Sequence, residues 1–309
     1  MRTGRLLAED GERFALLVKT PPYEELCALA REQAGELQSV SPDALRQQVE
    51  QILMLDGVPA GLQWLHDSGA LSQVLPELHA TVNFSQEAGR RHKDVWEHTK
   101  QVVWQSPARP LVRWSALLHD IGKVKTRAFT SDGKVTFHRH SEVGARMFED
   151  IGRRFKFERE HHRTLRFLIL HHLRPNSYLP SWTDSAVRRF AKEIGPYLPD
   201  LLDLSRADIT SRRPGRRQQG LGNIDTLSGR IDGIRAEDAV VPPLPSGIGD
   251  AIMDKFRMPP SKLIGDLKRE LLAKIESGDL EPRMESEYYL PYVEEMLAAR
   301  SEAPTPCCE

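Results

Sequence analysis

The segment LVRWSALLHDIGK, residues 111–123, constrains the fold most strongly because it resembles a buried helix that ends in two polar side chains. Apolar residues recur through it with helical spacing, and Gly122 stands where a left-handed residue would end the helix. We therefore predict that His119 and Asp120 lie in the last turn of a buried helix. A buried carboxylate is costly without a partner, so this pair indicates a polar site inside the fold.

Two other predicted helices carry polar side chains on an apolar face. In the helix predicted over residues 94–104, His98 shares a face with Val102. In the helix predicted over residues 201–208, Asp208 continues an apolar face. A single His or Asp in such a position is usually a hydrogen-bonded core residue, a cap or an ion-pair member. Four such groups on three helices instead favour a mixed nitrogen and oxygen site for a transition metal.

Two further segments rich in histidine strengthen the metal hypothesis. TFHRHSEVGARM carries His138 and His140 ahead of a predicted helix, and RFLILHHLRP ends another helix with His171 and His172. Imidazole nitrogens are suitable ligands for several divalent metals. The sequence therefore offers more candidate ligands than one metal ion needs.

The order of these residues resembles that of the HD-domain metal-dependent phosphohydrolases, in the branch that binds two metal ions. The segments HKDVWEHT, LLHDIGK, VTFHRHSEVGA and WTDSAVRRF are similar, more narrowly, to the HD region of bacterial tRNA nucleotidyltransferases, the CCA-adding enzymes. The resemblance is strongest over residues 75–210 and looser over 1–75 and 242–298. It implies an all-α fold: an HD-domain helical bundle with one short β-hairpin, flanked by N-terminal and C-terminal helical regions.

The resemblance also implies which residues form the site. One metal would be held by His98, His119, Asp120 and Asp208, and a second by the shared carboxylate of Asp120 together with His140 and His172. His171 is the alternative to His172, because neighbouring side chains on a helix do not easily face one point. The catalytic candidates are Asp120, Lys123 and Arg174, the last two as phosphate clamps or else as ordinary surface charges. The expected cofactor is one or two divalent transition metal ions, and Mn, Fe, Ni, Co and Zn all accept these ligands.

The resemblance, together with composition and helical patterns, implies that the chain has five parts. These are a helical neck-like region (1–85), the HD domain (86–212), a linker (213–241), a C-terminal helical body-like region (242–299) and a tail (300–309). The linker prediction rests on SRRPGRRQQGLGN, whose Arg, Gly and Gln content is typical of an exposed or partly disordered loop. Its arginines are either solvated or within reach of phosphate groups near Asp208. Within the HD domain, Asp132-Gly133 predicts the turn of the hairpin.

The resemblance implies a phosphohydrolase that acts on nucleotide or RNA-end phosphate esters, as a 2′,3′-cyclic phosphodiesterase, a 2′-nucleotidase or a phosphatase. The chain contains no Asp-x-Asp pair, which the nucleotide-adding head of the family needs to hold magnesium, so no nucleotide addition is expected. Two alternatives are a non-catalytic module that binds tRNA or other RNA, and a two-iron oxygenase with the same ligands. The net charge of −1 weakens the first alternative, because phosphate contacts dominate RNA affinity.

Cysteine usage and hydropathy indicate the compartment. Of the three cysteines, Cys27, Cys307 and Cys308, two form a terminal adjacent pair that cannot connect distant parts of a fold. No segment has the apolar length of a secretory signal or a membrane span. We therefore expect a cytoplasmic protein with no membrane partner, whose partners are a small nucleotide phosphate or RNA-end substrate and, as a further candidate, tRNA.

Overall fold

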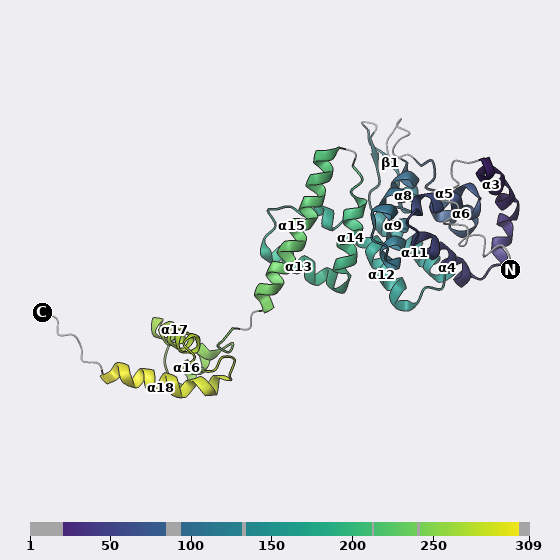
Figure 1. Cartoon of the computed structure of the whole chain (residues 1–309). Coiled ribbons are helices and arrows are strands. Elements are labelled where there is room, and N and C mark those ends of the chain that lie inside the picture. The colour runs from purple at the N-terminus through teal and green to yellow at the C-terminus, as the bar shows by residue number, and fades with distance from the viewer. Residues whose placement is uncertain (1–20, 85–93, 132–133, 212, 240–241, 303–309) are drawn as a thin grey trace. The chain divides into compact units, whose positions relative to one another are not determined.

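The computed structural model describes residues 21–84, 94–131, 134–211, 213–239 and 242–302 (Figure 1). The chain forms two compact units, and the boundary between them in the sequence falls between Asp232 and Gly233. The regular secondary structure of the described residues is helical, apart from one two-stranded hairpin, which confirms the all-α prediction.

The elements of the first unit follow one another in this order. The N-terminal elements are α3 (Pro21–Gln33), η1 (Ala34–Ser39), α4 (Pro42–Leu53), α5 (Val58–Asp67), α6 (Ala70–Val74) and α7 (Pro76–His79). The central elements are α8 (Val95–Gln105), α9 (Pro110–Leu118), α10 (Lys123–Thr126), β1 (Ala128–Phe129), β2 (Val135–Thr136), α11 (His140–Arg154) and α12 (Arg159–His171). The remaining elements are η2 (Pro175–Ser177), α13 (Asp184–Ile194), η3 (Gly195–Tyr197), α14 (Leu198–Asp208) and the greater part of α15 (Pro214–Ala239), which continues past the boundary at Asp232.

Helix α9 is the centre of the first unit. Every residue from Val112 to Leu118 is buried, and the helix packs against α8, α12 and α14. A helix that is apolar on nearly all sides can be stable in water only when it is surrounded in this way. The side chains at the end of α9 and just after it therefore lie in the interior of the bundle.

The N-terminal helices are attached to α9 by buried polar contacts. Arg113 of α9 is buried, and its guanidinium donates to the carbonyl oxygens of Leu53 and Leu55. Trp114 Nε1 donates to Glu50 Oε2 of α4 at 3.0 Å. Because a buried guanidinium must keep its hydrogen bonds, these contacts fix the end of α4 against the centre of the unit.

The expected left-handed helix end at Gly122 is wrong. Helix α9 ends at Leu118, and Gly122 has φ −67°, in the right-handed region. Glycine is needed there for another reason: a Cβ would lie 2.1 Å from the His140 carbonyl oxygen and 2.6 Å from Gly144 N. The missing side chain lets the segment after α9 pack directly on the backbone of the first turn of α11.

The short hairpin is present where the sequence indicates one. Strands β1 and β2 are antiparallel, with Ala128 opposite Thr136 and Phe129 opposite Val135. The predicted turn, Asp132-Gly133, lies outside the described residues.

The predicted linker at 213–241 is wrong as a description of local structure, because most of it is helix α15. The helix has a row of buried apolar side chains at helical spacing, formed by Ile224, Leu227, Ile231 and Ile234. Arg230, on the same helix, donates to Asp184 Oδ1 at 2.6 Å. The Arg- and Gly-rich beginning of the segment hid this apolar row in the sequence. Arg212, one of the four arginines of SRRPGRRQQGLGN, lies outside the described residues.

The second unit has a core of its own. Its helices α16 (Ile248–Phe256), α17 (Lys262–Glu276) and α18 (Ser286–Glu302) surround a cluster of buried apolar side chains that includes Leu267, Leu271 and Tyr289. Gly278, just past α17, has φ +85°, which a glycine accepts without strain. Across the described part of the chain, no helix combines the length and apolar character needed to cross a membrane.

Candidate metal centre

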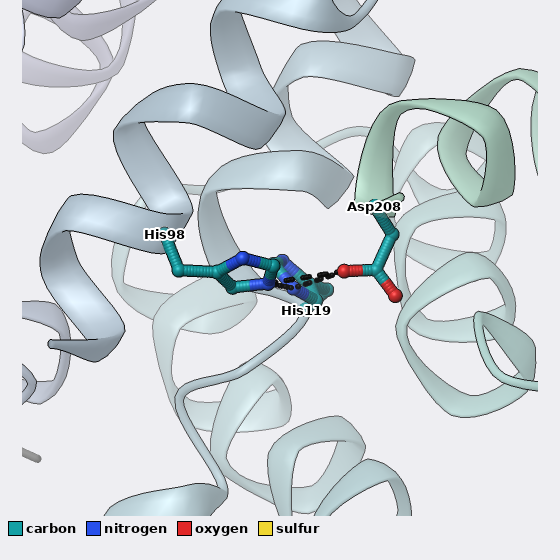
Figure 2. A group of neighbouring side chains, drawn as sticks. All are labelled: His98, His119 and Asp208. Atoms are coloured by element: carbon teal, nitrogen blue, oxygen red, sulfur yellow. Dashed lines mark hydrogen bonds and ion pairs between the residues drawn. The ribbon is translucent and has the colours of Figure 1, made fainter. Parts of the chain in front are cut away.

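Six polar side chains converge inside the first unit, and they come from α8, α11, α12, α14 and the segment that follows α9. They form two groups that could each hold a metal ion: His98, His119 and Asp208 (Figure 2), and Asp120, His140 and His172. Within each group, one ligand atom per residue lies within 4.8 Å of the others. The six ligands inferred from the sequence are therefore neighbours in the structure.

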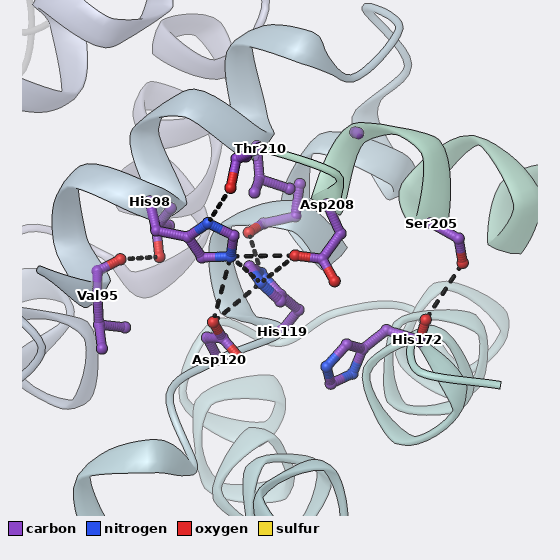
Figure 3. A network of polar contacts seen from close by, with 12 residues as sticks. Val95, His98, His119, Asp120, His172, Ser205, Asp208 and Thr210 are labelled. Carbon is purple, nitrogen blue, oxygen red and sulfur yellow. Dashed lines mark hydrogen bonds and ion pairs between the residues drawn. The ribbon is translucent and has the colours of Figure 1, made fainter. Parts of the chain in front are cut away.

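Asp120 lies between the two groups and faces each with a different oxygen. Its Oδ2 is 3.4 Å from His98 Nε2 and 3.2 Å from His119 Nε2 (Figure 3). Its Oδ1 is 3.4 Å from His140 Nε2. Asp208 belongs to the first group, where its Oδ1 is 3.0 Å from His98 Nε2. The two oxygens of Asp120 thus face different histidines, which is the arrangement that a carboxylate shared by two cations requires.

The hydrogen bonds made by Nδ1 determine which ring nitrogen of each histidine carries the proton. In three histidines Nδ1 lies against the carbonyl oxygen three residues earlier: His119 against Ala116 at 2.8 Å, His140 against Phe137 at 2.9 Å and His172 against Ile169 at 2.7 Å. A carbonyl oxygen only accepts, so each Nδ1 is the donor, and in the neutral ring Nε2 carries a lone pair. His98 Nδ1 lies 3.0 Å from Thr210 Oγ1. Such outer hydrogen bonds orient metal-binding imidazoles in proteins.

Helix ends explain why these carbonyl oxygens are available. His119 and His172 are the C-cap residues of α9 and α12. The last four carbonyls of a helix have no partner within it, and those of Ala116 and Ile169 are among them. The carbonyl of His172 in turn accepts from Ser205 Oγ of α14 at 3.2 Å. Helix termination therefore both places these two imidazoles and holds their orientation.

The second group has a polar contact that is unfavourable without a cation. His140 Nε2 and His172 Nε2 are 3.3 Å apart, and both Nδ1 protons are already committed to carbonyls. Burial lowers the pKa of His140, and burial together with the positive charge of His119 lowers that of His172 to about 4. At neutral pH two lone pairs therefore face each other at hydrogen-bond distance. A metal ion accepts both lone pairs, so these residues fit a metal ligand set.

The first group holds a positive charge of its own. Burial alone would lower the pKa of His119, but Asp120 and Asp208 outweigh it and raise the pKa to about 10. Burial opposes ionisation of these two carboxyls, yet mainly His119 keeps the pKa of each well below its usual range. At neutral pH the positive charge of protonated His119 therefore offsets one of the two carboxylate charges. A divalent cation would displace this proton, so its apparent affinity should rise with pH.

The site is buried on one side and partly open on the other. The side chains of His119 and Asp120 are 1% and 3% exposed, whereas those of His98 and Asp208 are 16% and 14% exposed. Lys123 lies at the partly open site, with Nζ 2.6 Å from Asp120 Oδ2. A ligand from solvent would therefore approach past His98 and Asp208, with a lysine charge beside the shared carboxylate.

The other candidate residues lie outside the two groups. His171 packs against the Phe167 ring, with centroids 4.3 Å apart, and His138 is exposed. Arg174 forms a surface ion pair with Glu193 at 2.6 Å. Of the arginines in the predicted linker, Arg217 contacts Gln105 Oε1 at 3.4 Å. Thr210 was missed in the sequence; its spacing of two residues from Asp208 was the available signal.

Comparison with known families agrees with this geometry. Residues 80–213 match the model of the HD domain, and this part of the chain is an HD domain. The match contains both groups of candidate ligands.

The chain is also homologous to bacterial tRNA nucleotidyltransferases. It is 30% identical over 247 residues to the A-adding tRNA nucleotidyltransferase of Deinococcus radiodurans, covering 77% of this chain and 55% of that protein. It is 28% identical over 256 residues to the CC-adding tRNA nucleotidyltransferase of Thermus thermophilus, covering 81% of this chain and 56% of that protein. A multifunctional CCA protein of Pseudomonas aeruginosa is 32% identical over 170 residues, 50% of this chain and 40% of the relative. The chain thus spans about half the length of these relatives.

Proposed function

We propose that this protein is a metal-dependent phosphohydrolase that cleaves phosphate esters of nucleotides or RNA ends, with 2′,3′-cyclic phosphates and 2′-phosphates as its substrates. The observation that carries the proposal is the orientation of three imidazoles, those of His98, His119 and His140, toward the two oxygens of Asp120, with His172 Nε2 beside His140 Nε2. A protein that only bound RNA would have no use for two buried histidines, His140 and His172, whose Nε2 lone pairs face each other. Burying such groups without a ligand lowers stability.

The proposed ligands for two divalent ions are His98, His119 and Asp208 on one side and His140 and His172 on the other, with Asp120 shared. Bound divalent ions would lower the pKa of water and offset negative charge on the phosphoryl oxygens. In the reaction, a water oxygen bonds to phosphorus, one ribose oxygen–phosphorus bond breaks, and the released ribose oxygen takes a proton. The protein's own contribution is to orient the ligands through their Nδ1 bonds and to keep solvent from the buried side.

Lys123 is proposed to hold the phosphate. Its ammonium group already lies 2.6 Å from Asp120 Oδ2, so a positive charge is present where a phosphate oxygen would arrive. Arg174 remains a candidate of the same kind, but its pairing with Glu193 would first have to open. The choice of nucleotide and RNA-end esters rests on the relatives, which by name add nucleotides to tRNA.

Hydrolysis of small substrates tests the proposal directly. With manganese, nickel or cobalt added, the wild-type protein should hydrolyse at least one 2′,3′-cyclic or 2′-phosphorylated mononucleotide, because the groups that stabilise the transition state surround the phosphate. Release of product should disappear in the double variant His119→Ala, Asp120→Ala. Asp150→Ala, which removes an exposed carboxylate of α11, is the matched control and should keep wild-type turnover.

Other outcomes would support the alternative functions. An RNA-binding module would give no turnover with any of these esters and would bind tRNA with an affinity that falls steeply as salt rises. A two-iron oxygenase would likewise leave the esters intact, while the ferrous protein would consume dioxygen with an added organic substrate. Either set of results would contradict the proposal that the protein is a phosphohydrolase.

A further inference from the structure

A row of three aromatic and two cationic side chains leads from the candidate metal centre to the hairpin surface. We call it the aromatic–cation row, and its members are Lys123, Phe137, Phe84, Arg127 and Phe129. Lys123 Nζ lies 5.6 Å from the centroid of the Phe137 ring, and the Phe137 and Phe84 rings are 6.3 Å apart. The Arg127 guanidinium lies 5.1 Å from the Phe84 ring and 5.0 Å from the Phe129 ring. Each member thus touches the next.

The inner end of this row is connected to the proposed ligands by two separate contacts. Lys123 is paired with Asp120, and the Phe137 carbonyl accepts from His140 Nδ1 at 2.9 Å. The same residue that orients a candidate metal ligand therefore also presents an aromatic ring to the row. A molecule held by its phosphate beside Lys123 would have aromatic surface as its next neighbour.

The outer end of the row is open to solvent. Phe129 is 61% exposed, the most exposed of the large apolar side chains in the described part of the chain, and Arg127 is also exposed. Single exposed apolar residues are common on protein surfaces. Stacking with Arg127 also helps to stabilise a hairpin of two short strands. These two explanations could account for an exposed Phe129. They do not explain why the row continues through Phe84 and Phe137 to Lys123.

We infer that the aromatic–cation row binds the bases of a single-stranded RNA end whose terminal phosphate lies at the metal centre. Aromatic rings stack on nucleobases whatever their identity, and an arginine between rings adds attraction to bases and to the backbone phosphates. The row extends beyond the reach of one nucleotide, since Phe129 is separated from Lys123 by three other side chains. Short oligonucleotides, more than mononucleotides, are the substrates it fits.

This inference rests on the proposed function, because it assigns one of the two proposed substrate classes to the same site. It adds a specificity role for residues outside the ligand set. Phe129 and Arg127 would affect only substrates long enough to reach the hairpin. A mononucleotide would be hydrolysed equally well with or without them.

Direct binding of RNA tests the inference without requiring turnover. Fluorescence anisotropy with a labelled single-stranded hexaribonucleotide should give a Kd that rises about tenfold in Phe129→Ala, the size of one lost stacking contact. Phe129→Tyr, which keeps a ring, should restore binding. Trp104→Ala is the matched control: Trp104 is 57% exposed on α8, lies outside the row, and its loss should leave the Kd unchanged.

An abasic oligonucleotide of the same length separates stacking from charge. Its Kd should be the same for wild type and Phe129→Ala, because no base remains to stack. The inference is overturned if the wild type does not bind the hexaribonucleotide, if Phe129→Ala binds it as tightly as the wild type, or if Trp104→Ala weakens binding equally. Failure of the proposed function would appear separately, as absent turnover of mononucleotides by a protein that still binds RNA through Phe129.

Discussion

Replacement of Asp120 by alanine is expected to abolish metal binding in both groups and to reduce phosphohydrolase activity by on the order of a thousandfold or more. The reason is geometric. Oδ2 of Asp120 lies 3.4 Å from His98 Nε2 and 3.2 Å from His119 Nε2, and Oδ1 lies 3.4 Å from His140 Nε2. Removal of this one side chain therefore takes away an oxygen that faces each group of histidines. The effects are measured by metal content after equilibrium dialysis and by turnover of a 2′,3′-cyclic nucleotide.

Asp150→Ala is the control for the loss of a carboxylate, because Asp150 is exposed and is paired with Arg153 of the same helix. It should retain wild-type metal content and activity. Circular dichroism should show that the Asp120 variant keeps its helices. Retention of two metal ions per chain by Asp120→Ala would show that this carboxylate is not shared.

Gly122→Ala is expected to destabilise the first unit and to disrupt the second group of ligands. The new Cβ would lie 2.1 Å from the His140 carbonyl oxygen and 2.6 Å from Gly144 N, and backbone atoms cannot rotate away as side chains can. The first turn of α11, which carries His140, would have to move. Overpacking of this kind costs about 3 kcal/mol, or roughly 6–12 °C in Tm. Thermal unfolding and metal content measure the two effects.

Gly144→Ala is a control from the same interface. Its Cβ would meet Gly122 N and the Ile169 side chain at 3.5 Å, which is ordinary van der Waals contact. This variant should keep nearly the wild-type Tm and both metal ions. Equal behaviour of the two alanine variants would contradict the close approach between the segment after α9 and α11.

The sequence indicates which side chains come together in the candidate site because most of them lie at recognisable places on helices. His119 and Asp120 follow a largely apolar helical segment, and His98 and Asp208 stand on apolar faces. The choice of His172 over His171 could not be made from the residues, since both end the same helix. In the structure the rotation of α12 turns His172 inward and leaves His171 against Phe167.

Other features depend on contacts that the sequence does not encode locally. The acceptors for three histidines are backbone carbonyls, which every residue possesses, so no side-chain pattern identifies them. The role of Gly122 depends on α11, whose first turn begins 18 residues later in the chain. Helix α15 was missed because Arg and Gly dominate its beginning, although the spacing of Ile224, Leu227 and Ile231 was a sufficient signal.

The number of metal ions bound per chain tests the central claim most directly. Elemental analysis of gently purified protein, dialysed against manganese, should give two ions per chain for the wild type and for His171→Ala, and one for His172→Ala. This result follows because His172 faces His140 at 3.3 Å whereas His171 lies outside both groups. One ion in the wild type, or loss of an ion in His171→Ala but not in His172→Ala, would contradict the proposed two-metal centre.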